Sequence, residues 1–469
     1  MGSCVEKDIQ AGTLQANQCQ PFTLIIGVIC GSIVQIEPLL LDINKLRKLP
    51  FLNKVEVVVL ANGEDSQKVI SLTSQIFIDD SSLAFQVLEN QLPGNTLPIG
   101  QARSLLQKTV GRKMEAMPSS YAWILDDDMR IPIVASEYLS WLPAFRKKGI
   151  DVLIGSFNGG SPNPPAHGIR VQINDLIHNL RWLSKLKPEE KLPDRNQNNA
   201  IFRKEYPDYY YDLSRKHQKH LTQSYWVVPE YPKESVASAL QRILSGINKI
   251  FTGEPFLRPL ISELPCNPID ESYPSCNRGG NTFILSSSAL ISTPNIAMMS
   301  GKKENRRSDM IWAIINKYYH GLKIHAVSFP VNHHRYIGTS NSICLTKTVS
   351  EIKGAALYAA MLRYFEKSPN SAWFFTNEQI IEITNLYFNY IEERLMAYKE
   401  NFNAIHTMLE VLGLEFGNTN VEVEQLIDTV RKWVDFNNLN VIKTRLYLPE
   451  SYDELRIFLN SITEEIKKF

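Results

Sequence analysis

Roughly the first 160 residues alternate between short, mostly apolar runs and longer segments whose apolar residues recur at helical spacing. The apolar runs lack a regular polar alternation, which is typical of strands covered on both faces in a parallel sheet. The predicted strands are residues 22–30, 54–60, 83–88, 121–125 and 151–156. The predicted helices between them are residues 35–47, 66–76, 101–117 and 135–147. Strands that alternate with helices predict an α/β domain with a mostly parallel sheet flanked by helices.

The pattern between residues 157 and 345 is less regular. A turn-rich segment at 157–170 leaves the end of the predicted sheet, and such loops often carry binding groups on a rigid scaffold. Residues 188–220 are rich in Lys, Arg, Asn and Tyr, and we interpret them as an insertion or lid with a solvated surface. Further predicted elements are helices at 233–250 and 308–320 and strands at 282–285 and 323–329.

From about residue 350 onward, helical patterns dominate and no strand pattern remains. The predicted helices there are residues 352–365, 377–401, 405–412, 421–436 and 451–469. Apolar stripes of this kind more often form a packed bundle than a membrane or cofactor module. The chain therefore divides into a loose tail at 1–20, an α/β domain at 21–345 and an all-helical domain at 346–469, without an internal repeat.

Composition narrows the class of protein. A formal net charge of +1 gives no global field that would favour nucleic acid or an anionic membrane. No apolar run is long enough for a transmembrane helix, and the polar N-terminus lacks the apolar core of a signal peptide. The six cysteines are scattered and include no CxxC pair, which favours reduced thiols over a disulfide framework. We expect a cytoplasmic protein with no nucleic-acid partner, and its oligomeric state stays open.

The chemistry begins at Asp126, Asp127 and Asp128, which come directly after the apolar run Tyr121–Leu125. Ligands bind beyond the carboxyl ends of the strands in open parallel sheets. Three adjacent carboxylates repel one another unless a positive charge is present, and a divalent cation with oxygen ligands supplies one. The sequence therefore predicts a metal site at this end of the sheet rather than only a solvated acidic turn.

Two later stretches supply complementary groups. Asp309 lies at the start of the helix predicted at 308–320, and His333 and His334 follow the last predicted strand. Carboxylates together with an imidazole suit Mn²⁺ or Mg²⁺, with diphosphate oxygens completing the coordination shell. A separate carboxylate is then available as a general base toward an acceptor hydroxyl.

In this arrangement the first 340 or so residues resemble a glycosyltransferase of the GT-A fold, closest in layout to family 2. The resemblance rests on four features in the family's order: the turn 61–65 (Ala-Asn-Gly-Glu-Asp), the segment 100–103 (Gly-Gln-Ala-Arg), the triple aspartate, and Asp309 at the start of a later helix. It departs from the family at Ala61, where an aspartate that reads the uracil ring often stands. The donor nucleotide therefore stays open, with a UDP-sugar favoured.

The resemblance implies a role for each matching residue. Asp126 would contact the ribose or the metal, Asp128 would ligate the metal, and Asp127 would lie on the nucleotide side and point away from the metal. Asn62 and Arg103 would lie beside the nucleotide and its diphosphate. Asp309 would be the catalytic base of an inverting displacement. Either His333 or His334 would add a metal ligand, and Gly280 and Asn281 would shape the acceptor side.

The implied activity is metal-dependent transfer of a sugar from a nucleotide sugar to an acceptor hydroxyl, with inversion favoured. Two alternatives stay open. A nucleotidyltransferase would also use carboxylates and a metal on such a sheet, but residues 27–32 after the first strand hold no Lys or Arg for a phosphate loop. A non-catalytic scaffold, in which the helical domain binds a partner, does not require the aspartates to be intact.

Overall fold

The computed structural model describes residues 20–77, 82–90, 96–159, 166–193, 229–251, 264–334, 345–369, 373, 375–436 and 438–469. The tail expected at 1–20 lies outside them except for its last residue, and so does most of the insertion expected at 188–220.

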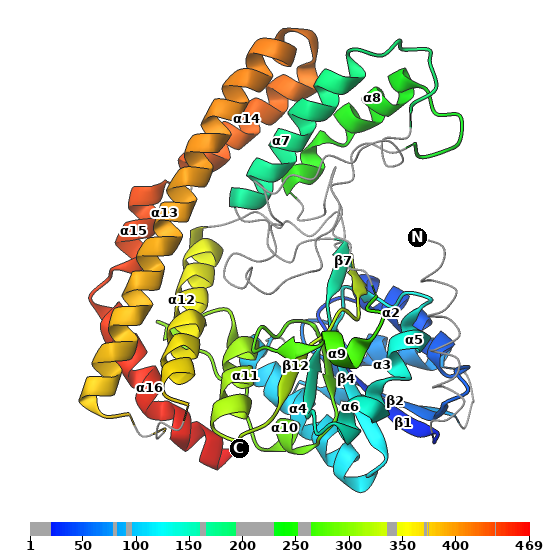
Figure 1. Ribbon diagram of the computed structural model, residues 1–469, viewed down its shortest axis with the longest axis vertical. Coiled ribbons are helices and arrows are strands. Elements are labelled where there is room, and N and C mark those ends of the chain that lie inside the picture. Colours follow the sequence, from blue (N-terminus) through cyan, green and yellow to red (C-terminus); the bar gives the residue numbers. More distant parts are fainter. Residues whose placement is uncertain are drawn as a thin grey trace.

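An eight-stranded sheet forms the lower part of the molecule in Figure 1, in the order β3-β2-β1-β4-β9-β6-β12-β8. Its strands are β1 (Phe22–Cys30), β2 (Leu52–Ala61), β3 (Leu83–Glu89), β4 (Ser120–Asp126), β6 (Val152–Ile154), β8 (Tyr273–Pro274), β9 (Asn281–Ile284) and β12 (Ile324–Ala326). The pairs β3-β2, β2-β1, β1-β4 and β6-β12 are parallel. β9 lies antiparallel between β4 and β6, and β8 is antiparallel to β12. The mostly parallel sheet predicted from the sequence is therefore confirmed.

Strand order reverses at β1. The chain passes from β1 to β2 and β3 on one side and then returns to place β4 on the other side. The carboxyl ends of β1 and β4 lie side by side at this point, with Ile29 opposite Asp126, and such a switch point is where open α/β sheets bind ligands. The triple aspartate begins at the last residue of β4, so it lies at this crevice.

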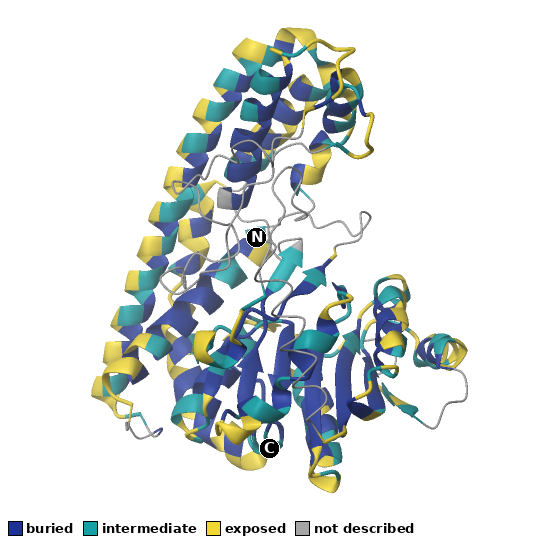
Figure 2. Ribbon diagram, turned by 45° about the vertical axis from the view of Figure 1, so that its right-hand side comes forward, coloured by how far each residue is buried: buried dark blue, intermediate teal, exposed yellow. Residues whose placement is uncertain are grey.

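Helices cover both faces of the sheet. One apolar cluster buries residues of α2 (Ile33–Leu46), α3 (Ser66–Ile76), α5 (Ala135–Leu139) and α6 (Leu142–Lys147). The other buries residues of α4 (Ile99–Ala116), α10 (Ser288–Ile291) and α11 (Ser308–Tyr318). β1, β2, β4, β6 and β9 are buried almost throughout (Figure 2), as expected for runs without polar alternation, whereas the edge strand β3 is partly exposed.

The C-terminal helices are α12 (Leu345–Lys367), α13 (Asn377–Phe416), α14 (Val421–Phe436), α15 (Leu439–Leu446) and α16 (Glu450–Lys468). α13 runs along one side of the molecule in Figure 1 and starts with a capping box between Thr376 and Gln379. α12, α13, α15 and α16 share the apolar cluster of α4 and α11. The far end of α13 and α14 pack with α7 (Ala166–Leu183) and α8 (Val236–Ser245). The boundary at 345/346 as a division into domains stays a prediction.

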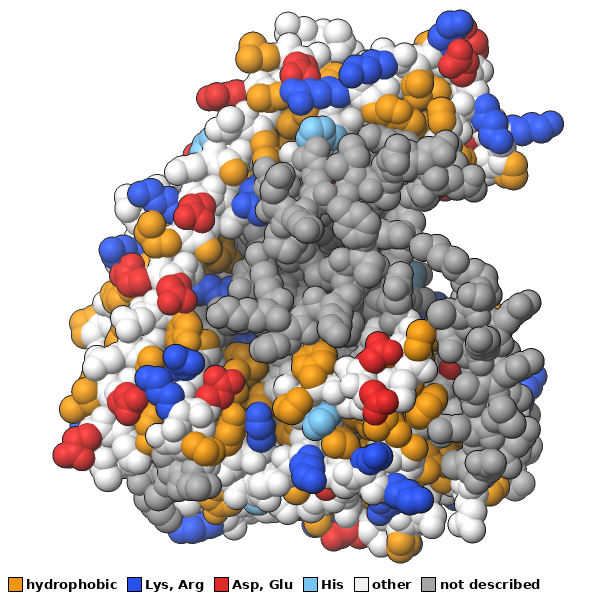
Figure 3. All heavy atoms as spheres, viewed as in Figure 1, with side chains coloured by type: hydrophobic (Ala, Val, Ile, Leu, Met, Phe, Trp, Pro, Cys, Tyr) orange, Lys and Arg blue, Asp and Glu red, His pale blue; other side chains and the backbone are white. Residues whose placement is uncertain are grey.

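Several elements differ from the sequence expectation. The helix expected at 135–147 is two short helices, α5 and α6, and the two helices expected at 377–401 and 405–412 are the single helix α13. α7 replaces part of the loop expected at 157–170, and α15 was not expected. Within the described residues, no helix has the length and apolar character required to cross a membrane. On the face shown in Figure 3, basic and acidic side chains are interspersed, in line with the small net charge.

Candidate active site at the switch point

Asp126 lies at the crevice between β1 and β4, directly against Gly280 in the turn before β9. Its backbone N–H donates to the carbonyl of Gly280, at 3.2 Å. A Cβ at Gly280 would lie 2.1 Å from an oxygen of the Asp126 carboxylate, a separation that atoms do not tolerate. Gly280 is therefore the residue that lets this carboxylate lie against the turn before β9.

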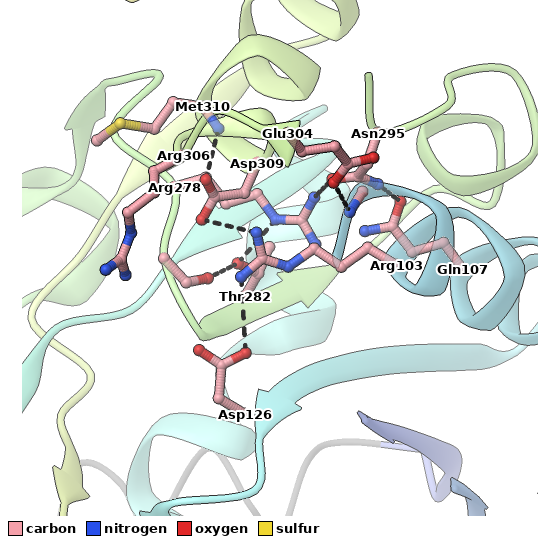
Figure 4. A network of polar contacts seen from close by, with 12 residues as sticks. Arg103, Gln107, Asp126, Arg278, Thr282, Asn295, Glu304, Arg306, Asp309 and Met310 are labelled. Atoms are coloured by element: carbon pink, nitrogen blue, oxygen red, sulfur yellow. Dashed lines mark hydrogen bonds and ion pairs between the residues drawn. The ribbon is translucent and has the colours of Figure 1, made fainter. Parts of the chain in front are cut away.

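Arg103 connects the two ends of the predicted site. One terminal nitrogen of its guanidinium lies 3.9 Å from Oδ1 of Asp126, and the other lies 3.6 Å from Oδ2 of Asp309. Figure 4 shows this guanidinium between the two carboxylates. Burial alone would lower the pKa of Arg103, but Asp309 and Asp126 outweigh it and raise that pKa. Residues about 180 positions apart in the sequence therefore meet through one cation.

Burial raises the pKa of Asp126, and the neighbouring carboxylates of Asp128 and Asp309 add to the effect against the opposing guanidinium of Arg103. An additional positive charge at the crevice would stabilise the ionised form of Asp126. Perturbed acids of this kind cluster at functional sites, so the shift supports a binding role for the crevice.

Asp309 occupies the first turn of α11, and its side chain is 13% exposed. Its Oδ1 accepts a hydrogen bond from the backbone N–H of Met310, at 3.0 Å. The other oxygen faces Arg103. The carboxylate therefore points toward the crevice rather than only complementing the helix dipole, as Figure 4 shows.

A small three-stranded sheet brings Asp128 to His333. β5 (Met129–Arg130) pairs with β13 (Val331–His333), which also pairs with β7 (Phe157–Gly159). This register places Nε2 of His333 2.9 Å from Oδ2 of Asp128. His333 is buried, whereas His334 is exposed and its backbone N–H donates to the carbonyl of Asp128. The ring of His333 is therefore buried against the aspartates.

Asp128 and His333 fit a divalent metal whose coordination shell is completed by a bound substrate. Within the described residues, no group of three His, Cys, Asp or Glu side chains is arranged to hold a metal ion by itself. Asp128 and His333 form a close pair, and Nδ1 of the buried His333 ring has no hydrogen-bond partner there. One carboxylate and one imidazole suit Mn²⁺, and metals of this kind often take their remaining ligands from substrate phosphates and water.

Asp127 and Asn62 lie beside the crevice but bond to the protein. Oδ2 of Asp127 accepts from the backbone N–H of Gly31, at 2.7 Å, so this carboxylate points to the turn after β1. Burial, with Asp128 adding to it, raises the pKa of Asp127 to about 7. The side-chain amide of Asn62 accepts from the N–H of Leu97 at 2.7 Å and donates to its carbonyl at 3.2 Å. These two hydrogen bonds of Asn62 hold the segment before α4 in place.

Asn281, expected on the acceptor side, lies inside the sheet. Its side chain is fully buried and accepts from Nε1 of Trp123 at 2.8 Å. It donates to the carbonyls of Ser156 and Phe329, at 2.9 and 2.8 Å. The amide has no surface left for an acceptor, and its role is to join β4, β9 and the ends of β6 and β12. Its position inside an antiparallel strand could not be inferred from the Gly-Gly-Asn motif.

Two charged residues near Arg103, Arg278 and Glu304, were not predicted from the sequence. Arg278 is buried over the Trp312 ring, 4.0 Å from its centroid, and donates to Thr282 and Asn295. Burial lowers the pKa of Arg278 to about 9. Glu304, on β11 (Lys303–Glu304), accepts from the backbone N–H of Gly100 at 2.9 Å. The position of Arg278 directly before Gly279-Gly280 was the only signal available in the sequence.

Comparison with known proteins gives structural likenesses only. No protein-family model matches the chain, and no curated protein matches its sequence. One similar solved structure is the mannosyltransferase PcManGT from Pyrobaculum calidifontis in complex with GDP-Man and Mn²⁺, at 9% identity and a TM-score of 0.36, covering 99% of this chain and 97% of that one.

Two further likenesses are of the same kind. Glucosyl-3-phosphoglycerate synthase from Mycobacterium tuberculosis with Mn²⁺, UDP and glucosyl-3-phosphoglycerate is 12% identical, with a TM-score of 0.32 over 73% of this chain and 79% of that one. S. aureus TarS 1-349 is 12% identical, with a TM-score of 0.31 over 95% and 92%. Similarity at this level carries no argument about activity, and the fold class follows from the strand order of the chain itself.

Proposed function

We propose that the chain is a metal-dependent glycosyltransferase that moves a sugar from a nucleotide-sugar donor to an acceptor hydroxyl with inversion. The observation that carries the proposal is the bridge by Arg103 between Asp126 at the switch point and Asp309 on α11. The Arg103 guanidinium lies between Asp309, the candidate base, and Asp126, the candidate nucleotide-binding residue. The order of motifs that resembles family 2 of the GT-A glycosyltransferases supports the same reading.

The residues divide into two sides. The crevice with Asp126 would take the ribose and diphosphate of the donor, with a UDP-sugar favoured, and Asp128 and His333 would hold Mn²⁺ or Mg²⁺. When bound, the metal would offset the negative charge that develops on the leaving diphosphate. Arg103 lies where its guanidinium can attract the diphosphate and keep Asp309 oriented.

Asp309 would act as the general base. Its carboxylate accepts the proton of the acceptor hydroxyl while the hydroxyl oxygen bonds to the anomeric carbon. The bond from that carbon to the diphosphate oxygen breaks, and the diphosphate leaves with the electron pair. A single displacement of this kind inverts the anomeric configuration, because the nucleophile enters opposite the leaving group.

Calorimetry of nucleotide-sugar binding tests the proposal. We expect at least one of a panel of UDP- and GDP-sugars to bind the wild-type chain in the presence of Mn²⁺ and to bind much more weakly after EDTA treatment. Asp128→Ala should abolish the metal dependence, because it removes one of two protein ligands. If no nucleotide sugar bound in a metal-dependent way, the proposal would be wrong.

A further inference from the structure

The backbone turn that precedes Asp309 is unusual. Arg307 has φ 76° and ψ 21°, and no other described residue apart from glycine has a positive φ. A residue with a Cβ adopts this left-handed conformation only when its surroundings hold it there. The carbonyl of Arg307 accepts from the N–H groups of Met310 and Ile311, at 3.1 Å each. The conformation of Arg307 therefore sets how α11 starts and where Asp309 points.

The groups that hold this turn come from α12, in the C-terminal helical part. The Glu351 carboxylate accepts from a terminal nitrogen of Arg307 and lies 3.3 Å from Nε of Arg306. Oγ of Ser350 accepts from the backbone N–H of Arg306, at 3.1 Å. A Cβ at Gly354 would lie 2.1 Å from the Arg306 carbonyl oxygen, so the two backbones are in direct contact. One turn of α12 thus fixes both residues before α11.

Glu351 is ionised in this position. Its side chain is 15% exposed, and burial alone would raise its pKa. The guanidiniums of Arg307, Arg306 and Arg394 outweigh the burial and lower the pKa below its ordinary value. Because the Glu351 carboxylate is charged and pairs with both Arg306 and Arg307, it forms a strong and directional hydrogen bond that holds Arg307 in place.

α12 is fixed on the same side by a second buried contact. Nζ of the buried Lys353 lies 3.0 Å from Oε2 of Glu454 and 3.1 Å from Oγ of Ser300. Oε1 of Glu454 accepts from the N–H of Gly301, at 3.0 Å. Ser300 and Gly301 lead into β11, which carries Glu304 against the start of α4. The whole segment from 300 to 307 therefore rests on α12 and α16.

We infer that Glu351 is a positioning residue for Asp309, which it aligns by holding Arg307 in the left-handed conformation. This inference rests on the proposed function in so far as Asp309 is the base. It assigns part of the active-site geometry to the C-terminal helices, which therefore do more than pack against α4 and α11. Glu351 itself contacts neither Asp309 nor Arg103 in the described contacts and acts through Arg307.

The test combines Glu351→Gln, Arg307→Ala, Arg307→Gly and the double variant Glu351→Gln/Arg307→Gly. Glycine adopts the left-handed conformation without help, so Arg307→Gly keeps the turn while it loses the ion pair. Glu415→Gln is the control, because it removes an ion pair with Arg181 at the far end of α13. Turnover, donor affinity by calorimetry and hydrogen exchange of residues 308–315 are measured for each variant.

We expect Glu351→Gln to lower kcat by between about tenfold and a hundredfold, since displacement of a catalytic group by about 1 Å has effects of that size. Donor Kd should stay within about twofold, and exchange should accelerate in 308–315 but not in α13. Arg307→Gly should retain about tenfold more activity than Arg307→Ala, which carries the full left-handed penalty. In the Arg307→Gly background, Glu351→Gln should have little further effect.

Wild-type kcat together with unchanged exchange in Glu351→Gln would overturn the inference. Losses that multiply in the double variant would overturn it too, because Glu351 would then not act through Arg307. Exchange that rises equally in α13 would show general destabilisation instead of positioning. If the wild-type chain transferred no sugar, the proposed function would fall, while local exchange in 308–315 would still decide whether Glu351 holds the turn.

Discussion

Replacement of Gly280 by alanine tests the geometry of the crevice. The new Cβ would lie 2.1 Å from Oδ2 and 2.4 Å from Cγ of Asp126. The backbone cannot yield easily, because the Asp126 N–H bonds to the Gly280 carbonyl and β4 pairs with β9 from Ala122 to Leu125. The carboxylate must therefore move, and an ordinary contact of 3.4 Å requires a retreat of at least 3.4 − 2.1 = 1.3 Å.

A displacement of this size takes Asp126 away from Arg103, whose nearest nitrogen is already 3.9 Å from Oδ1. Misplacement by about 1 Å lowers rates by about a hundredfold, so we expect kcat/KM of Gly280→Ala to fall by roughly that factor. Overpacking of this kind also lowers the free energy of unfolding by about 1–3 kcal/mol. The assay is release of nucleoside diphosphate from the donor, together with urea unfolding of the same preparation.

Gly413→Ala is the matched control. Its nearest neighbour would lie at 3.6 Å, an ordinary contact, and the residue is inside α13, far along the sequence from the crevice. We expect unchanged kcat/KM and a gain of up to about 1 kcal/mol in stability from the higher helix propensity of alanine. Wild-type activity and stability in Gly280→Ala would refute the close approach of Asp126 to the turn before β9.

Three further predictions follow from single contacts. Asp309→Asn should lower kcat by about a hundredfold or more and leave donor Kd nearly unchanged in calorimetry, because a general base acts in the transition state; a large loss of donor affinity would contradict this. His333→Ala should weaken Mn²⁺-dependent donor binding far more than His334→Ala, because the His333 ring lies against the Asp128 carboxylate whereas His334 bonds to the backbone carbonyl of Asp128, and equal effects would argue against the His333–Asp128 pair. Asp42 pairs with Arg130 and Lys45, which outweigh its burial and lower its pKa below 3.8. The ionised form of Asp42 therefore stabilises the fold above that pH. This contribution to the free energy of unfolding is lost as pH falls through the pKa of the folded state. Urea unfolding from pH 3 to 7 should therefore show the difference between wild type and Asp42→Asn shrinking at the acid end, and a constant difference would contradict it.

Much of the sheet was predictable from local pattern. β1 matches its predicted bounds and β2 and β4 extend theirs by one or two residues, because an unbroken apolar run has few alternatives to a buried strand. The direction of β9 was not predictable, since a four-residue strand carries no local signal of its partner or orientation. α7 had a signal, with Ile169, Ile173, Leu176 and Leu180 at helical spacing, but the Gly- and Pro-rich stretch before it was extended too far.

Some residues of the candidate site could be predicted from the sequence and others could not. Asp126, Asp128 and Asp309 could be proposed because their order along the chain and their places at element ends are sequence properties. The side-chain contacts of Arg278 and Glu304 depend on distant segments meeting in three dimensions, and no local pattern encodes that. Asn281 belongs to a motif that suggested a binding role, but its amide is buried and bonds to Trp123, Ser156 and Phe329 inside the protein.

Crystals soaked with Mn²⁺ and a donor that calorimetry shows to bind test the central claim most directly. Anomalous scattering at the manganese edge should give one peak within ligand distance of Asp128 and His333, bridged to the diphosphate, with the anomeric carbon of the sugar on the side of Asp309. A donor bound away from the β1/β4 crevice, or a manganese peak that involves neither Asp128 nor His333, would contradict the account.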